Sequence, residues 1–156
     1  GIEFLAMENY LLTLGVKRMY ATTAFGIHIK NASMIFNKAS GATYIQMLGD
    51  VGAQIVDSMK TEDAKIAYAG SGTFVCITER DMGQTTEDLE IMINIGLMDF
   101  EAIYATDRLP VPQVRVGEIA RSSFLSPTKP TRMLERAIAS AIAPPEKRGK
   151  SGQMVA

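Results

Sequence analysis

The sequence has one cysteine, one histidine and no tryptophan among its 156 residues. A single thiol, Cys76, cannot form an internal disulfide, which favours a reducing, intracellular setting. A lone histidine, His28, offers no spacing of metal ligands, so we expect no metal site. No apolar run reaches the ~18 residues that a membrane-spanning helix needs, and the start lacks the pattern of a secretory signal. We therefore expect a cytoplasmic chain, or one within a virus-like particle, that is not secreted and has no membrane partner.

The few residues that carry chemistry in other proteins have structural explanations in this sequence. His28 lies between Ile27 and Ile29, which places it on the opposite, solvent-facing side of a predicted strand. Cys76 lies inside the apolar run 74–77, where a buried structural thiol is the usual outcome. The run Gly70-Ser71-Gly72 is followed by a strand rather than by the Lys and helix of a phosphate-binding loop, which favours a tight turn. We expect that the chain has no catalytic residue, binds no cofactor and is not an enzyme.

Residues 65–104 are the best-defined stretch of the chain. Residues 65–79 are rich in aromatic and β-branched side chains on both sides of the glycines, which predicts two strands joined by a hairpin turn. A helix follows, with Thr85 or Thr86 as its N-cap and apolar residues recurring every three or four positions. The segment 89–95 also satisfies the period of a strand, but its length and its cap favour the helix.

The rest of the chain alternates helical and extended patterns. We expect a helix over residues 2–14, a hairpin over 25–36 with its turn at 30–33, and an amphipathic helix over 43–60. That last helix is predicted to pack on the sheet through Ile45, Leu48, Ile55 and Met59. After residue 106, Leu109-Pro110-Val111-Pro112 must be extended. Residues 113–119 suit an edge strand or arm, and 131–143 a short helix that Pro144-Pro145 stops.

These elements predict the α+β class, with an antiparallel sheet of two hairpins and helices on one face. Residues 1–106 form the predicted core domain, and 107–156 an extended basic C-terminal arm that contains the short helix and a tail. The order helix, hairpin, helix, strands, helix resembles that of roadblock-type dimerisation modules. As an alternative function, this resemblance implies a dimeric regulatory or scaffold module.

Charge is divided unevenly along the sequence. Residues 1–106 carry seven Lys and Arg against thirteen Asp and Glu, whereas residues 107–156 carry nine against four. Contact between the arm of one copy and the body of another is therefore attractive. We expect the arm to dock on neighbouring subunits through apolar anchors and basic side chains, namely Ile138, Ile142, Arg132, Arg136, Lys147, Arg148, Lys150 and Val155.

The functional hypothesis is a non-enzymatic structural subunit of a larger homo-oligomeric assembly, such as a viral or phage particle. The start at Gly1 rather than Met agrees with a processed chain or an expression remnant. The partners would be further copies of the chain or other subunits of the assembly. A second alternative is a nucleic-acid-binding subunit of a ribonucleoprotein complex, which would bind through the basic arm.

Overall fold

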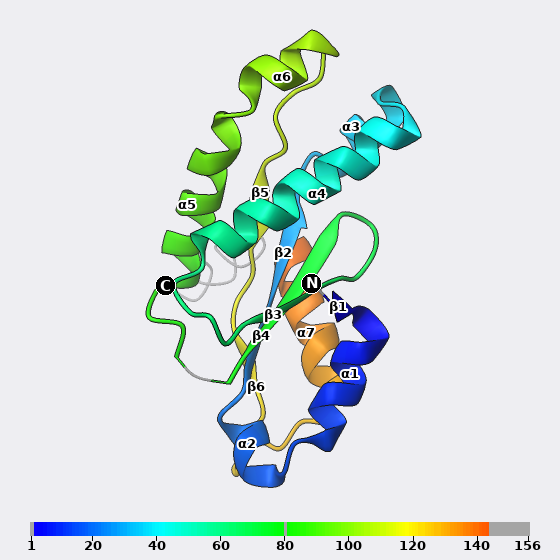
Figure 1. Ribbon diagram of the computed structural model, residues 1–156. Helices are drawn as coiled ribbons and strands as arrows, with labels where there is room; N and C mark the ends of the chain where they lie inside the picture. The colour runs from blue at the N-terminus through cyan, green and yellow to red at the C-terminus, as the bar shows by residue number, and fades with distance from the viewer. Residues whose placement is uncertain (1, 80, 144–156) are drawn as a thin grey trace, which may run out of the picture.

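The sheet is centred on two antiparallel strands, β2 (Thr23–Ile29) and β4 (Thr73–Thr78), paired from Thr23 opposite Thr78 to His28 opposite Thr73. In the computed structural model, which describes residues 2–79 and 81–143, the strand order is β1-β3-β4-β2-β5 (Figure 1). The short strand β6 also pairs with β2. The flanking strands are β1 (Ile2–Glu3), β3 (Lys65–Tyr68), β5 (Val114–Val116) and β6 (Ala120–Arg121).

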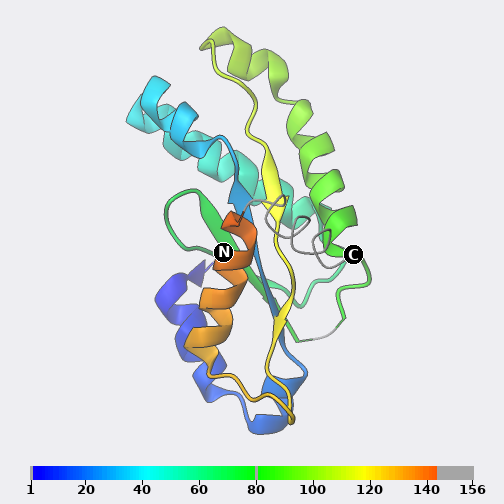
Figure 2. The same cartoon turned by 180° about the vertical axis from the view of Figure 1, so that it is seen from behind.

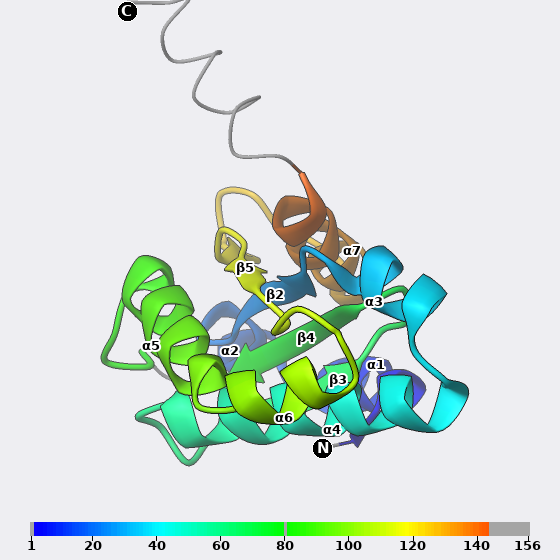
Figure 3. The same cartoon turned by 90° about the horizontal axis from the view of Figure 1, so that it is seen from above.

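Helices cover both faces of this sheet. One face carries α4 (Gly41–Ser58) and α5 (Thr86–Met98), and the other carries α1 (Phe4–Thr13) and α7 (Pro130–Ile142). Figure 3 shows α4 and α7 on opposite sides of the strands, and Figure 2 shows α1 beside α7. The short helices are α2 (Val16–Tyr20), α3 (Ala32–Lys38) and α6 (Glu101–Thr106).

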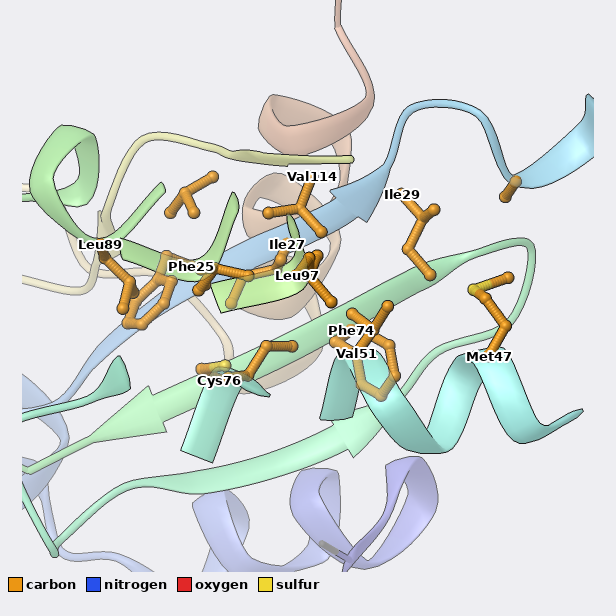
Figure 4. Close-up of a cluster of buried hydrophobic side chains, with 14 of the residues drawn as sticks. Phe25, Ile27, Ile29, Met47, Val51, Phe74, Cys76, Leu89, Leu97 and Val114 are labelled. Atoms are coloured by element: carbon orange, nitrogen blue, oxygen red, sulfur yellow. The ribbon is translucent and has the colours of Figure 1, made fainter. Parts of the chain in front are cut away.

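The larger core lies between the sheet and the pair α4 and α5 (Figure 4). Alternate residues of β2 point into it, because side chains of a strand alternate between the two faces. Phe25, Ile27 and Ile29 are fully buried there, and Cys76 of β4 lies among them. The expected buried thiol at Cys76 is confirmed.

The second core lies under α1 and α7. The residues of β2 and β4 that alternate with those of the first core, including Ala24, Val75 and Ile77, point to this face. They pack against Met7 of α1 and Leu134 of α7. Gly26 lets α7 approach closely, because a Cβ at Gly26 would lie 2.6 Å from the carbonyl oxygen of Ala137. The two central strands are thus apolar on both faces, which is why helices are needed on both.

The α+β class expected from the sequence is confirmed. The expected placement of the helices on one face is wrong, because α7 covers the second apolar face of β2 and β4. The described part of residues 107–156 is also not a separate arm. Its strands β5 and β6 pair with β2, and α7 packs against the same sheet.

The hairpin expected over residues 25–36 is also wrong, since only its first strand forms. β2 ends at Ile29, and residues 32–38 form α3 with Ile35 fully buried. The Asn31 side chain fixes this turn by donating to the carbonyl of Val111 at 2.9 Å and accepting from the N–H of Gln113 at 3.0 Å. A contact over 80 residues along the chain therefore decides a local structure that short-range periodicity cannot.

The helix expected over 43–60 forms as α4, but its buried face differs by a fraction of a turn. Met47, Val51 and Ile55 are fully buried, whereas Ile45 is 69% exposed. Leu48 and Met59 are only partly buried. The helix expected after Thr85 begins with that N-cap, which accepts from Asp88 N–H at 3.0 Å, and it then divides into α5 and α6 around residues 99–100.

Among residues 2–79 and 81–143, no helix has both the length and the apolar character needed to cross a membrane.

Candidate functional site

A groove of about 480 Å³ opens between α3, the start of α4 and the turn that joins β3 to β4. We call it the aromatic groove. Its volume falls within the range of small-molecule sites. Its lining residues are Ala32, Ser33, Phe36, Asn37, Tyr44, Tyr68 and Ser71.

The β3–β4 turn forms one wall and is held in a left-handed conformation. Gly70, Ser71 and Gly72 have φ values of 88°, 51° and 75°. Cross-turn hydrogen bonds close it, from Ala69 N–H to the Thr73 carbonyl at 2.8 Å and from Thr73 N–H to the Gly70 carbonyl at 3.0 Å. A Cβ at position 72 would lie 2.6 Å from Ala32 Cβ, so glycine lets the turn contact α3.

Three aromatic side chains form the other walls. The rings of Phe36 and Tyr44 meet edge to face with centroids 5.1 Å apart, a favourable arrangement for such pairs. The hydroxyl of Tyr68 accepts from the N–H of Gly72 at 2.9 Å, which ties the wall to the turn. Burial, with a hydrogen bond to Tyr68, raises the pKa of Tyr44 above its ordinary value. Phe36 is 61% exposed and presents a free apolar surface.

The groove lining carries no charged side chain. Its polar groups are the Asn37 amide and the hydroxyls of Ser33, Ser71 and the tyrosines. In the part of the chain that the structure describes, no group of three His, Cys, Asp or Glu is arranged to hold a metal ion. The groove can therefore stack a planar ring on its aromatic walls and form hydrogen bonds with that ring's edge.

The residues weighed for chemistry in the sequence lie apart from one another. His28 lies on the face of β2 opposite to Ile27 and Ile29, as expected, but it is half-buried and its Nδ1 lies 2.8 Å from Thr73 Oγ1. Burial and the nearby charge of Arg115 lower the pKa of His28. Burial raises the pKa of the Cys76 thiol well above its usual range. The expected tight turn at Gly70-Ser71-Gly72 is present and borders the groove.

The predicted interface residues fall on α7 or beyond it. Arg132 and Arg136 are exposed, with Arg132 3.8 Å from Glu135. Ile138 packs partly against the second core, whereas Ile142 is 45% exposed. Docking of these residues on another subunit stays a prediction. The remaining predicted residues, Lys147, Arg148, Lys150 and Val155, lie outside the described residues.

The aromatic groove was not predicted from the sequence. The sequence places Phe36 at the end of a predicted strand and Tyr44 near the start of a predicted helix, with Asn37 in neither, so no pattern placed them beside the Gly-rich turn. The one local signal of the groove in the sequence is the run Gly70-Ser71-Gly72, which predicts the turn that forms one wall. The other walls come from elements whose positions depend on long-range packing.

Comparison with known proteins gives a consistent result for the fold. No family model and no curated protein matches the sequence. Among solved structures, an EAL/GGDEF domain protein from M. capsulatus matches with a TM-score of 0.62 at 16% identity, covering 88% of this chain and 86% of that one. The GGDEF domain of DgcB from Caulobacter crescentus, in complex with c-di-GMP, matches with a TM-score of 0.56 at 16% identity, covering 82% and 72%. The active GGEEF domain of a diguanylate cyclase from Vibrio cholerae matches with a TM-score of 0.53 at 9% identity, covering 76% and 74%.

The fold is therefore that of GGDEF domains. This corrects the functional hypothesis drawn from the sequence. A structural subunit of a viral or other assembly and the absence of enzymatic activity are both contradicted, because domains of this fold include diguanylate cyclases, which are enzymes. The alternative of a dimeric regulatory or scaffold module of roadblock-like topology is wrong for the same reason.

The names GGDEF and GGEEF spell short residue motifs in the one-letter code, and these motifs can be compared with the sequence. Neither Gly-Gly-Asp-Glu-Phe nor Gly-Gly-Glu-Glu-Phe occurs in the sequence. The turn beside the aromatic groove continues as Gly70-Ser71-Gly72-Thr73-Phe74, which shares the first and last of those letters. Its middle positions are polar or glycine and carry no carboxylate.

Proposed function

We propose that this chain is a signalling domain that binds a guanine nucleotide in the aromatic groove. The observation that carries the proposal is the combination of aromatic walls, an amide side chain and a tight left-handed turn around one cavity of about 480 Å³. The fold supports the choice of ligand, because one structure that shares it holds c-di-GMP and another is a diguanylate cyclase domain.

Each part of the groove has a role in this proposal. The exposed ring of Phe36 offers a stacking surface for a base, and Tyr44 supports that ring from its edge. The Asn37 amide has both donors and an acceptor, which suits the edge of guanine. The hydroxyls of Ser33 and Ser71 lie on the lining, where they can bond to the sugar or phosphate groups.

Isothermal titration with GTP, c-di-GMP and ATP tests the proposal. We expect a guanine compound to bind more tightly than ATP. Phe36→Ala should weaken binding about 5- to 150-fold, which corresponds to the ~1–3 kcal/mol of one base stacked on an aromatic ring. Asn37→Ala should reduce the preference for guanine over adenine.

Ile45→Ala is the matched control, because Ile45 is exposed on α4 and does not line the groove. It should leave the affinity unchanged. Absence of binding by both guanine compounds, or equal weakening by Phe36→Ala and Ile45→Ala, would contradict the proposal. Chromatography of the GTP samples for a cyclic dinucleotide measures whether recognition is accompanied by turnover.

A further inference from the structure

Four large apolar side chains project into solvent at one end of the molecule. Phe124 is 83% exposed and Leu125 is 93% exposed, and the two are neighbours in the segment between β6 and α7. Leu12 and Val16, at the junction of α1 and α2, are 65% and 69% exposed. We call these four residues the apolar tip.

The two segments that carry the apolar tip lie side by side, and Phe124 and Leu125 do not line the cleft between them. A cleft of about 290 Å³ is lined from both segments, with Leu12 and Val16 on one side and Pro127 and Pro130 on the other. Figures 1 and 2 show α2 and the segment that precedes α7 at the same end of the molecule.

The turn that carries Phe124 and Leu125 is closed by hydrogen bonds. Ser123 and Ser126 exchange backbone hydrogen bonds of 3.2 Å in both directions, so that the two apolar residues occupy the corner. The hydroxyl of Ser122, which is buried, accepts from Thr128 N–H at 2.8 Å and anchors the turn. The fold therefore holds two apolar side chains away from any core of the described chain.

The segments that carry the tip are basic, although the whole chain has a net charge of −1. Glu8, one turn before Leu12 on α1, is the acidic side chain next to them and accepts from Thr131 at 3.3 Å. Residues 12–20 and 120–130 contain four basic side chains and no acidic one. Arg18 pairs with Glu79 at 2.6 Å. Lys17, Arg121 and Lys129 are exposed around the tip.

We propose that the apolar tip docks on a membrane surface of anionic lipids. Exposed apolar residues within a basic surround suit the boundary between headgroups and acyl chains, where the apolar groups insert and the cations attract acidic headgroups. A stable protein partner would need about 800 Å² per side, supplied by roughly 20–30 residues, whereas the apolar tip consists of four side chains. This proposal differs from the sequence-based expectation of no membrane partner, which stays a prediction, and it is independent of the proposed nucleotide binding.

Flotation with phosphatidylcholine vesicles, with and without phosphatidylserine, tests the proposal on the full chain. We expect binding only when phosphatidylserine is present. Phe124→Ser with Leu125→Ser should lower the bound fraction at least about tenfold. The triple variant Lys17→Gln, Arg121→Gln, Lys129→Gln should lower the affinity by about two orders of magnitude.

Ile91→Ser with Ile95→Ser is the matched control, because these residues are 56% and 65% exposed on α5, away from the tip. This variant should bind like the unaltered chain. Failure of the chain to bind anionic vesicles, equal binding to neutral ones, or equal effects of the tip and control variants would overturn the proposal. Circular dichroism on each variant checks that it is folded.

A spectroscopic test locates the contact directly. The chain has five tyrosines but no tryptophan, so Leu125→Trp introduces a single indole at the tip that can be excited selectively. Its emission should shift to the blue on addition of phosphatidylserine vesicles, because the ring leaves water. Ile95→Trp should show no shift, and an equal shift for both would overturn the assignment of the tip.

Discussion

At the scale of single residues, glycine sets the distance between α7 and the sheet. Gly26→Ala would bring its Cβ to 2.6 Å from the carbonyl oxygen of Ala137, so the backbone of α7 would have to move. We expect a loss of ~1–3 kcal/mol in the free energy of unfolding, measured by chemical denaturation.

Gly49 is the contrasting position, because a Cβ there would meet no atom within 4 Å. Gly49→Ala inside α4 should stabilise the protein by up to ~1 kcal/mol, through helix propensity and a less flexible unfolded chain. Equal effects of Gly26→Ala and Gly49→Ala would show that α7 does not pack on β2 as described.

Tyr104 provides a residue-scale prediction that depends on pH. Its hydroxyl donates to Asp50 Oδ2 at 2.8 Å, and burial, with this carboxylate, raises the pKa of Tyr104 well above its usual range. Because the folded pKa exceeds the unfolded value of about 10, the stabilisation is complete below pH ~10 and is lost as pH rises further. Tyr104→Phe should cost ~0.5–3 kcal/mol at neutral pH. It should also weaken the alkaline fall in stability, and an unchanged alkaline profile would contradict this assignment.

At the scale of elements, side chains of α5 form hydrogen bonds with the backbone groups on the outer edge of β5. Asn94 accepts from Val114 N–H at 2.8 Å and donates to its carbonyl at 3.0 Å, and Glu90 accepts from Val116 N–H at 2.8 Å. Side chains thereby occupy the groups through which an edge strand would otherwise pair with another chain.

Removing Asn94 should expose this edge. We expect Asn94→Ala to cost ~1–3 kcal/mol and to speed hydrogen exchange of the Val114 amide. The Val116 amide, which Glu90 holds, serves as the internal control. Asn94→Asp keeps an acceptor for Val114 N–H and should retain most of its protection. Unchanged exchange at Val114 in Asn94→Ala would show that the side chain does not bind the edge.

The sequence predicts single helices, caps and turns better than it predicts which elements pack against one another. The helix around Ile55, the cap at Thr85 and the hairpin turn at residues 70–72 depend on local chemistry, and all three are present. The hairpin expected over 25–36 fails because Asn31 binds the distant segment 111–113. The aromatic groove has the same origin, since its walls meet only after long-range packing.

At the scale of the whole molecule, α7 is part of the core rather than an appendage. Leu134 is fully buried, whereas Ile142 on the same helix is 45% exposed. Leu134→Ala should cost ~2–5 kcal/mol and Ile142→Ala much less, as measured by thermal unfolding. Because β2 and β4 have buried side chains on both faces, both variants should still unfold in a single transition. Similar losses for both variants would instead favour docking of α7 on another chain.

The position of α7 in the chain has a consequence for biosynthesis. β2 begins at Thr23, but the helix that covers one of its faces ends only at Ile142. At about 5–20 residues per second, synthesis of the chain from Thr23 to Ile142 takes about 6–24 s. Ala24 has no α7 to cover it during that interval, and Val75 and Ile77 have none from the time they are made. The nascent chain should therefore be a substrate for ribosome-associated chaperones until α7 is made.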